Sequence, residues 1–454
     1  MTITLVLLSG TLTVLLGRWL FGKWFNHVGL YGSIWSCTLV LFEADLVHFY
    51  PLVLETWLFI IAGWIGFVLG SASVVCARFA LGVSSEDNEK AGGPERSLRT
   101  FTIMLWVLNA IVIFDMIYLI RVISGLIGGM DNFLGAAILL YALRTSGGIP
   151  GAIPYLSASA LAGCLLGGIY IARRGRARLV AIIPFIVIVI DSMLSLDRGT
   201  IITASVLFAS GYLLEKKRDS HLRSTLPRTR IRRFVAIVAG ILLIVTGLEF
   251  VRSNRGIDEK YFAGGSTLSR MQEGSFVTPS IFFYVTGQFG VLNQYLKKDV
   301  EQNIIGRYTL APFWRTIAKL GFETDVETHQ PFYRTPIVSN NGTYLREFHA
   351  DYGLPGIALG PFVLGAMVSG LWFRAQRTGR LMDKMLLGHM LVFVVMSIFQ
   401  VVAQQGSWLA SLLSGLLLSY LIDRESFSKP LWPRSGLSQV AEYAGIPKAT
   451  DFTR

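Results

Sequence analysis

Long apolar runs, separated by short polar turns, dominate the chain. An α-helix needs about 20 mainly apolar residues to cross the hydrocarbon core of a bilayer. We predict that eleven runs cross, at residues 2–17, 28–48, 52–76, 101–123, 151–171, 179–196, 200–214, 234–250, 354–373, 385–403 and 406–422. The pattern therefore predicts an all-α polytopic membrane protein with eleven transmembrane helices.

Two further apolar segments do not fit the spanning pattern. Residues 131–146 are too short to span and are followed by the helix-breaking sequence Gly147-Gly-Ile-Pro150, which predicts a re-entrant or interfacial helix. Residues 280–295 are apolar but interrupted by polar residues. We predict a helix lying along the membrane surface there, with a twelfth span as the alternative.

One long polar segment, residues 251–353, interrupts the apolar runs. It holds 11 Lys/Arg, 10 Asp/Glu and 17 aromatic residues. A disordered linker would be poor in aromatic residues, so this segment is predicted to fold as a large, mostly helical loop. It divides the chain into helices 1–8 (residues 1–250), the loop carrying the active site, the last three helices (354–422) and a polar tail (423–454).

Charge sets the expected orientation. The chain is 52% hydrophobic with a net charge of +12, and clusters of Lys and Arg fill residues 173–178, 216–233 and 374–384. Short loops rich in Lys and Arg stay in the cytoplasm, which places segment 251–353 outside. The positive excess is therefore an orientation signal, and no nucleic-acid partner is expected.

Cofactor motifs are absent from the sequence. No phosphate-binding Gly-rich loop opens a helix, and the three cysteines lie in apolar runs without zinc-ligand spacing. Glu323, Asp325 and Glu327 alternate, but a solvated surface explains them better than a metal site. We expect neither cofactor nor metal, so the energy for any reaction must come from the substrate or from an ion gradient.

The strongest chemical signal lies where the polar segment meets span 354–373. Thr343 or Asn341 is a plausible N-cap for a helix that carries a titratable cluster, namely Arg346, Glu347, His349 and Asp351. Arg346 can bind an anion, and the other three are candidate catalytic bases. The alternative interpretation is a salt-bridge cluster at a helix start.

Other candidates are spread along the chain. Arg198 lies in a short outer turn, where an arginine needs an anionic partner, either a lipid phosphate or a substrate phosphate. One or two of the loop arginines can reach a diphosphate. The loop arginines are Arg255, Arg270, Arg307, Arg315 and Arg334, with Arg270 and Arg307 as the leading candidates. Tyr284 and Gln288, on the surface helix, are candidate sugar contacts.

Several of these stretches, in this order, resemble the patterns of one enzyme family. They are Arg198-Gly199, Tyr284-Val-Thr-Gly through Leu292-Asn-Gln-Tyr295, Tyr308-Thr-Leu-Ala-Pro-Phe-Trp, Asn340-Asn-Gly-Thr-Tyr-Leu-Arg346 and Asp351-Tyr-Gly353. Together with many spans and one large loop before the last three, they resemble the Wzy-type O-antigen polymerases. Asn340 and Tyr344 in this pattern are expected substrate contacts.

The resemblance implies a GT-C-type glycosyltransferase of the bacterial inner membrane, with its active site facing the periplasm. Its donor would be a growing glycan on undecaprenyl diphosphate, and its acceptor one lipid-linked repeat unit. Membrane lipids and a chain-length regulator are further candidate partners. An O-antigen ligase would use the same arginines, Arg198, Arg346, Arg270 and Arg307, so it remains the alternative. A polysaccharide flippase is a second alternative, although the chain lacks internal repeats.

Overall fold

The protein is mainly helical. The computed structural model describes residues 2–44, 46, 49–82, 98–146, 149–153, 155–175, 178–216, 279–298, 304–322, 330–335 and 338–427. The elements, in order, are α1 (Thr2–Phe21), α2 (His27–Glu43), α3 (Leu54–Ala80), α5 (Leu98–Ile127), η1 (Met130–Asn132), α6 (Ala137–Ser146), α7 (Ala158–Arg174), α8 (Leu179–Leu194), α9 (Arg198–Glu215), α12 (Pro279–Lys297), α13 (Ala311–Lys319), β1 (Tyr333–Arg334), β2 (Val338–Ser339), α14 (Tyr344–Tyr352), α15 (Leu354–Thr378), α16 (Leu381–Met396), η2 (Val402–Gln404) and α17 (Gly406–Phe427). Within these ranges, β1 and β2 form the one sheet, an antiparallel pair that places Tyr333 opposite Ser339.

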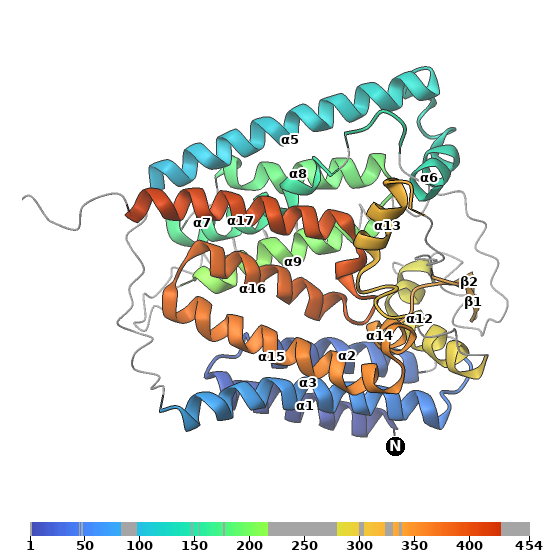
Figure 1. The fold of residues 1–454 in the computed structure, drawn as a ribbon. Coiled ribbons are helices and arrows are strands. Elements are labelled where there is room, and N and C mark those ends of the chain that lie inside the picture. The colour runs from blue at the N-terminus through green and yellow to red at the C-terminus, as the bar shows by residue number, and fades with distance from the viewer. Residues whose placement is uncertain are drawn as a thin grey trace, which may run out of the picture.

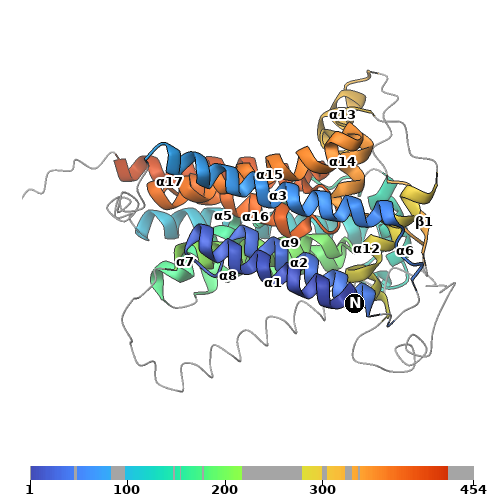
Figure 2. The ribbon, with the colours of Figure 1, turned by 90° about the horizontal axis from the view of Figure 1, so that it is seen from below.

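The long helices run alongside one another, and the short elements gather at one end of the bundle. In both views α6, α12, α13, α14 and the β1–β2 hairpin lie at the same end (Figures 1 and 2). The predicted segment 251–353 contributes most of these elements, and α6 comes from the predicted interfacial segment 131–146. One end of the bundle therefore carries nearly all of the described polar segment.

Five helices are long and apolar enough to cross a membrane. They are α1, α3, α5, α15 and residues Gly406–Arg424 of α17. Predicted spans 28–48, 151–171, 179–196, 200–214 and 385–403 form helices of 16 to 18 residues, α2, α7, α8, α9 and α16. Span 234–250 lies outside the described residues. A helical membrane protein is thus supported, and the count of eleven spans stays a prediction.

The outer faces of the five long helices are apolar. On α3, Leu54, Leu58, Ile61, Ile65 and Leu69 are all exposed at spacings of three or four residues, which places them on one stripe. Comparable exposed leucines lie on α1 and α17. Such a surface would be unfavourable in water and is expected in lipid.

Glycines allow α3 and α15 to pack at backbone distance. A Cβ added at Gly66 would lie 2.6 Å from the Ala358 carbonyl oxygen, and one at Gly70 would lie 1.9 Å from that of Phe362. This Gly-x-x-x-Gly spacing is typical of close helix pairs in membranes. Earlier in α3, a Cβ at Gly63 would lie 2.5 Å from the Leu345 side chain, so α14 also packs closely against α3.

Helix α12 is packed inside the protein. Phe282, Phe283, Phe289, Leu292 and Tyr295 are buried in its 19 residues. Their partners include aromatic rings of α2, to which α12 is adjacent. A helix was predicted over 280–295, close to the observed bounds of α12. It was expected to lie along the membrane surface, whereas the aromatic side of α12 faces the protein core.

Candidate functional site

The polar cluster of α14 is almost completely buried. The helix begins after Thr343, one of the two predicted N-caps, whose side chain makes no capping hydrogen bond, and it ends at Gly353, whose φ of 65° favours glycine. Arg346, Glu347 and Asp351 are each at most 1% exposed. Buried charges are costly unless they are paired or hydrogen-bonded, so the partners of each residue indicate its role.

Glu347 accepts two hydrogen bonds from the segment between α16 and α17. Its Oε2 accepts from the backbone N–H of Val401, and its Oε1 accepts from Nε2 of Gln404 at 3.0 Å. Burial raises the pKa of Glu347 to about 8, although the nearby Arg346 charge and these two bonds act in the opposite direction. A carboxyl group with this pKa can take up or release a proton near neutral pH.

Arg346 keeps part of its donor capacity unused. Its Nη1 donates to the Asn340 carbonyl oxygen at 3.0 Å, while the buried Nη2 has no hydrogen-bond partner among the described residues. The guanidinium lies 6.0 Å and 5.9 Å from the ring centres of Tyr308 and Tyr333. A buried cationic donor without a partner is suited to binding an anion.

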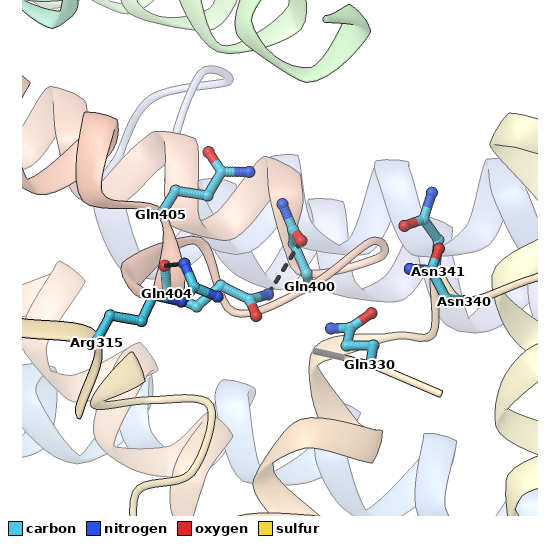
Figure 3. Close-up of a pocket in the computed structure, with 7 residues that line it drawn as sticks. All are labelled: Arg315, Gln330, Asn340, Asn341, Gln400, Gln404 and Gln405. Carbon is cyan, nitrogen blue, oxygen red and sulfur yellow. Dashed lines mark hydrogen bonds between the residues drawn. The ribbon is translucent and has the colours of Figure 1, made fainter. Parts of the chain in front are cut away.

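Gln404 and Asn340, the hydrogen-bond partners of Glu347 and Arg346, also line a polar pocket. Its volume is about 200 Å³, and Figure 3 shows the side chains that line it: Arg315, Gln330, Asn340, Asn341, Gln400, Gln404 and Gln405. Six of the seven are carboxamides, which both donate and accept hydrogen bonds. The lining fits a ligand rich in hydroxyl groups, with one guanidinium for an anionic part.

Hydrogen bonds connect this pocket to α14. Gln404 Nε2 donates both to Glu347 Oε1 and to Gln400 Oε1, each at 3.0 Å. Arg315 Nη1 donates to the Gln404 carbonyl oxygen at 3.3 Å. Gln330 Nε2 is buried without a hydrogen-bond partner among the described residues. Asn340 and Gln404 therefore link the pocket to the buried pair Arg346 and Glu347, whose side chains do not themselves line it.

Asp351 has a different environment from Glu347. Its Oδ1 accepts from the Tyr308 N–H at 2.8 Å, and its Oδ2 accepts from the Thr309 N–H at 2.8 Å and the Thr309 hydroxyl at 2.7 Å. Burial raises the pKa of Asp351, and these bonds together with the Arg307 charge oppose the rise. The carboxylate fixes the turn that leads into α13, which makes it a positioning residue.

Asp351→Ala is expected to destabilise the protein. Two backbone N–H groups would lose their acceptor, and each buried unsatisfied group costs about 1–3 kcal/mol. Asp351→Asn retains one acceptor oxygen and should lose less stability while remaining active. Unfolding in detergent, followed together with the activity of the folded fraction, measures both effects. A well-folded but inactive Asp351→Asn variant would instead assign this residue a catalytic role.

His349 lies between α3 and α12. Its Nδ1 is hydrogen-bonded to the Tyr295 hydroxyl at 2.8 Å, and its ring centre lies 5.2 Å from that of Phe59. Burial lowers the pKa of His349, so the ring is neutral near pH 7. It does not line the polar pocket. Of the three predicted bases, Glu347 is the one whose side chain contacts a pocket residue.

The predicted diphosphate arginines separate in the structure. Arg198 is the first residue of α9, which Asp197 caps, and its guanidinium lies 5.8 Å from the Tyr284 ring centre. Tyr284 in turn stacks on Phe399 at 5.0 Å, next to the pocket residue Gln400. Arg198 is therefore near the site but not in the pocket lining. Arg307 is buried, with its guanidinium 5.4 Å from the Tyr308 ring centre, and Arg270 lies outside the described residues.

The predicted substrate contacts also differ in position. Asn340 lines the pocket, and its contact with a substrate stays a prediction. The Tyr344 side chain is fully buried, and its hydroxyl is hydrogen-bonded to that of Tyr31 at 3.0 Å, which makes it part of the core. Gln288 is buried too, and its amide donates to the Tyr284 carbonyl within α12.

Most of the pocket lining was not among the sequence candidates. The lining residues that were not candidates, Gln330, Gln400, Gln404 and Gln405, come from two separate stretches. A signal for part of it exists in the sequence, because Gln400 lies near the end of predicted span 385–403, and Gln404 and Gln405 fill the gap before span 406–422. Polar amides at the end of a membrane helix need hydrogen-bond partners, and a ligand can supply them.

Metal binding has no support in the described part of the chain, where no three His, Cys, Asp or Glu side chains gather as metal ligands. The carboxylates of 323–327 lie outside the described residues.

No protein-family model, curated protein or solved structure matches this chain. The pocket and α14 are therefore the features from which a function can be inferred.

Proposed function

We propose that this protein is a lipid-diphosphate-dependent glycosyltransferase that polymerises oligosaccharide repeat units. The observation that carries the proposal is the pair of hydrogen bonds that links an amide-lined pocket to the buried residues Arg346 and Glu347. Carboxamides suit sugar hydroxyls, which donate and accept hydrogen bonds as they do. An arginine whose Nη2 has no hydrogen-bond partner in the described part of the chain suits a diphosphate, so each half of a lipid-linked sugar has a candidate partner.

The reaction follows from these groups. A hydroxyl of the acceptor sugar attacks the anomeric carbon of the donor, the carbon–oxygen bond to the diphosphate breaks, and the hydroxyl proton goes to a base. Arg346, with Arg315 at the pocket wall, stabilises the charge that develops on the leaving diphosphate. Glu347 takes the proton, because its pKa of about 8 lies near the working pH. Gln404 covers Glu347 in this structure, so its side chain must turn aside for the acceptor to approach.

The proposed setting is the bacterial inner membrane. The donor is a growing glycan on undecaprenyl diphosphate, and the acceptor is one repeat unit on the same lipid. With eleven spans and the Lys/Arg clusters inside, segment 251–353 faces the periplasm. The five long apolar helices support a membrane location for such an enzyme.

Complementation tests the proposal in cells. Expression in a bacterium that lacks its own repeat-unit polymerase, but supplies the matching lipid-linked unit, is expected to restore a ladder of surface polysaccharide lengths. A host lacking only the ligase serves as the comparison. Restoration of polysaccharide in the ligase-deficient host alone would identify a ligase. A flippase would be indicated if the wild-type protein never produced the ladder but supported glycan translocation. Its Arg346 and Glu347 variants would then translocate glycan as well as the wild type.

A further inference from the structure

Helix α13 and its flanks expose an unusual amount of apolar surface. Ile305, Leu310, Phe313, Leu320 and Phe322 are each between 48% and 74% exposed. Leu310, Phe313 and Leu320 are three and seven residues apart, so they form one stripe along the helix axis. Five large apolar side chains within 18 residues would be an aggregation-prone patch in water.

The opposite side of the same segment is fixed to the protein. Tyr308 and Ala311 are fully buried, and Asp351 holds the turn before the helix. Trp314 Nε1 donates to the Gly306 carbonyl oxygen at 3.0 Å. The apolar stripe therefore has a defined direction, and it points away from the bundle.

The attachment of α13 also fixes its depth. Arg315 donates to the carbonyl of Gln404, two residues before α17 begins at Gly406, and α13 packs against η2. Residues Gly406–Arg424 form one of the five helices able to cross a membrane. A segment that is hydrogen-bonded to the residues just before a spanning helix lies at the level of the bilayer surface. Figures 1 and 2 show α13 at this end of the bundle.

From these observations we infer that α13 is an interfacial helix whose stripe of Leu310, Phe313 and Leu320 inserts among the acyl chains of the bilayer. A short helix with one apolar side and one polar side lies in the plane of the interface in this way. The apolar outer face of α17, with Leu413 and Leu417 exposed, belongs to the same bilayer-facing surface. Since Arg315 projects from α13, the bilayer contact would also hold one wall of the polar pocket in place.

Spin-label accessibility tests the inference independently of any enzyme activity. Labels are attached to Phe313→Cys and Leu320→Cys in the full chain, with Ala318→Cys as the matched control. Ala318 is exposed on the same helix and lies on the side away from the stripe. The exposed Cys37 and Cys76 are replaced by alanine, whereas the buried Cys164 remains. The protein is reconstituted in nanodiscs of phosphatidylethanolamine and phosphatidylglycerol without any polyprenyl lipid.

The expected result is a severalfold excess of collisions with oxygen over collisions with a water-soluble nickel chelate at 313 and 320, and the reverse at 318. Greater access to the chelate at 313 and 320 would show that the stripe faces water and would overturn the inference. Immobile labels reached by neither reagent would overturn it too, since they would show that a protein surface covers the stripe.

Discussion

Arg346→Ala is expected to lower the rate of polymer formation by about 100-fold or more, the usual cost of removing one donor that stabilises developing charge. The guanidinium is buried against Tyr308 and Tyr333, and its Nη2 has no hydrogen-bond partner among the described residues. Its loss would leave the leaving diphosphate without this donor. The rate is measured with purified protein and lipid-linked repeat units, normalised to the folded fraction.

Two further variants separate charge from packing. Arg346→Lys keeps the charge but lacks the planar fork, and it should recover only a small part of the rate. Arg334→Ala removes an exposed arginine from the neighbouring strand and should leave the rate near that of the wild type. If Arg346→Ala polymerised at a normal rate, the arginine would have a structural role only.

Glu347→Gln is expected to lower kcat/KM by about 100-fold or more, because it removes a base while keeping the shape of the side chain. For the wild type, kcat/KM should rise with pH up to about 8 and then level off, since only the ionised carboxylate accepts a proton. The glutamine variant should lack this rise. The measurement is a pH profile of initial rates for both proteins.

The stability of the wild-type protein should fall as the pH rises, whereas its kcat/KM should increase. Burial raises the pKa of Glu347 from an ordinary 4.5 to about 8, so its protonated form is favoured in the folded state. This contribution is complete below about 4.5 and is lost as the pH rises through about 8. Unfolding of the wild type should therefore become easier at alkaline pH relative to Glu347→Gln.

The Gln404→Ala variant tests whether Glu347 acts as a base or only positions the Gln404 side chain. The variant leaves the carboxylate in place and removes the side chain that covers it. It should keep the pH-dependent rise, with weaker substrate binding seen as a higher KM. Equal losses in Gln404→Ala and Glu347→Gln, with the pH profile unchanged in both, would assign Glu347 a positioning role.

The sequence predicted the helical framework well wherever local pattern determines it. Thr343, one of the two predicted N-caps, directly precedes α14, and the predicted junction between 251–353 and 354–373 coincides with the start of α15. Predicted span 101–123 lies within α5. These features depend on hydrophobic runs, caps and glycines, which act over a few residues.

The pocket depends on contacts between distant parts of the chain and was mostly missed. Glu347 and Gln404 are 57 residues apart, and Asp351 meets Thr309 across 42 residues. The cluster at 346–351 was singled out by its residue types, but its sequence cannot show that Asp351 supports a turn while Glu347 is hydrogen-bonded to Gln404 of the pocket lining. The burial of the aromatic side of α12 was likewise not predicted, because its partners on α2 lie far away in the sequence.

The most direct measurement of the central claim uses purified protein supplied only with an undecaprenyl-diphosphate-linked repeat unit, without nucleotide sugar or lipid-A core. We predict a ladder of lipid-linked oligomers, with one undecaprenyl diphosphate released for each bond formed and no ladder from Glu347→Gln or Arg346→Ala. A preparation that stays inert until lipid-A core is added, and then makes a single transfer, would contradict the polymerase assignment.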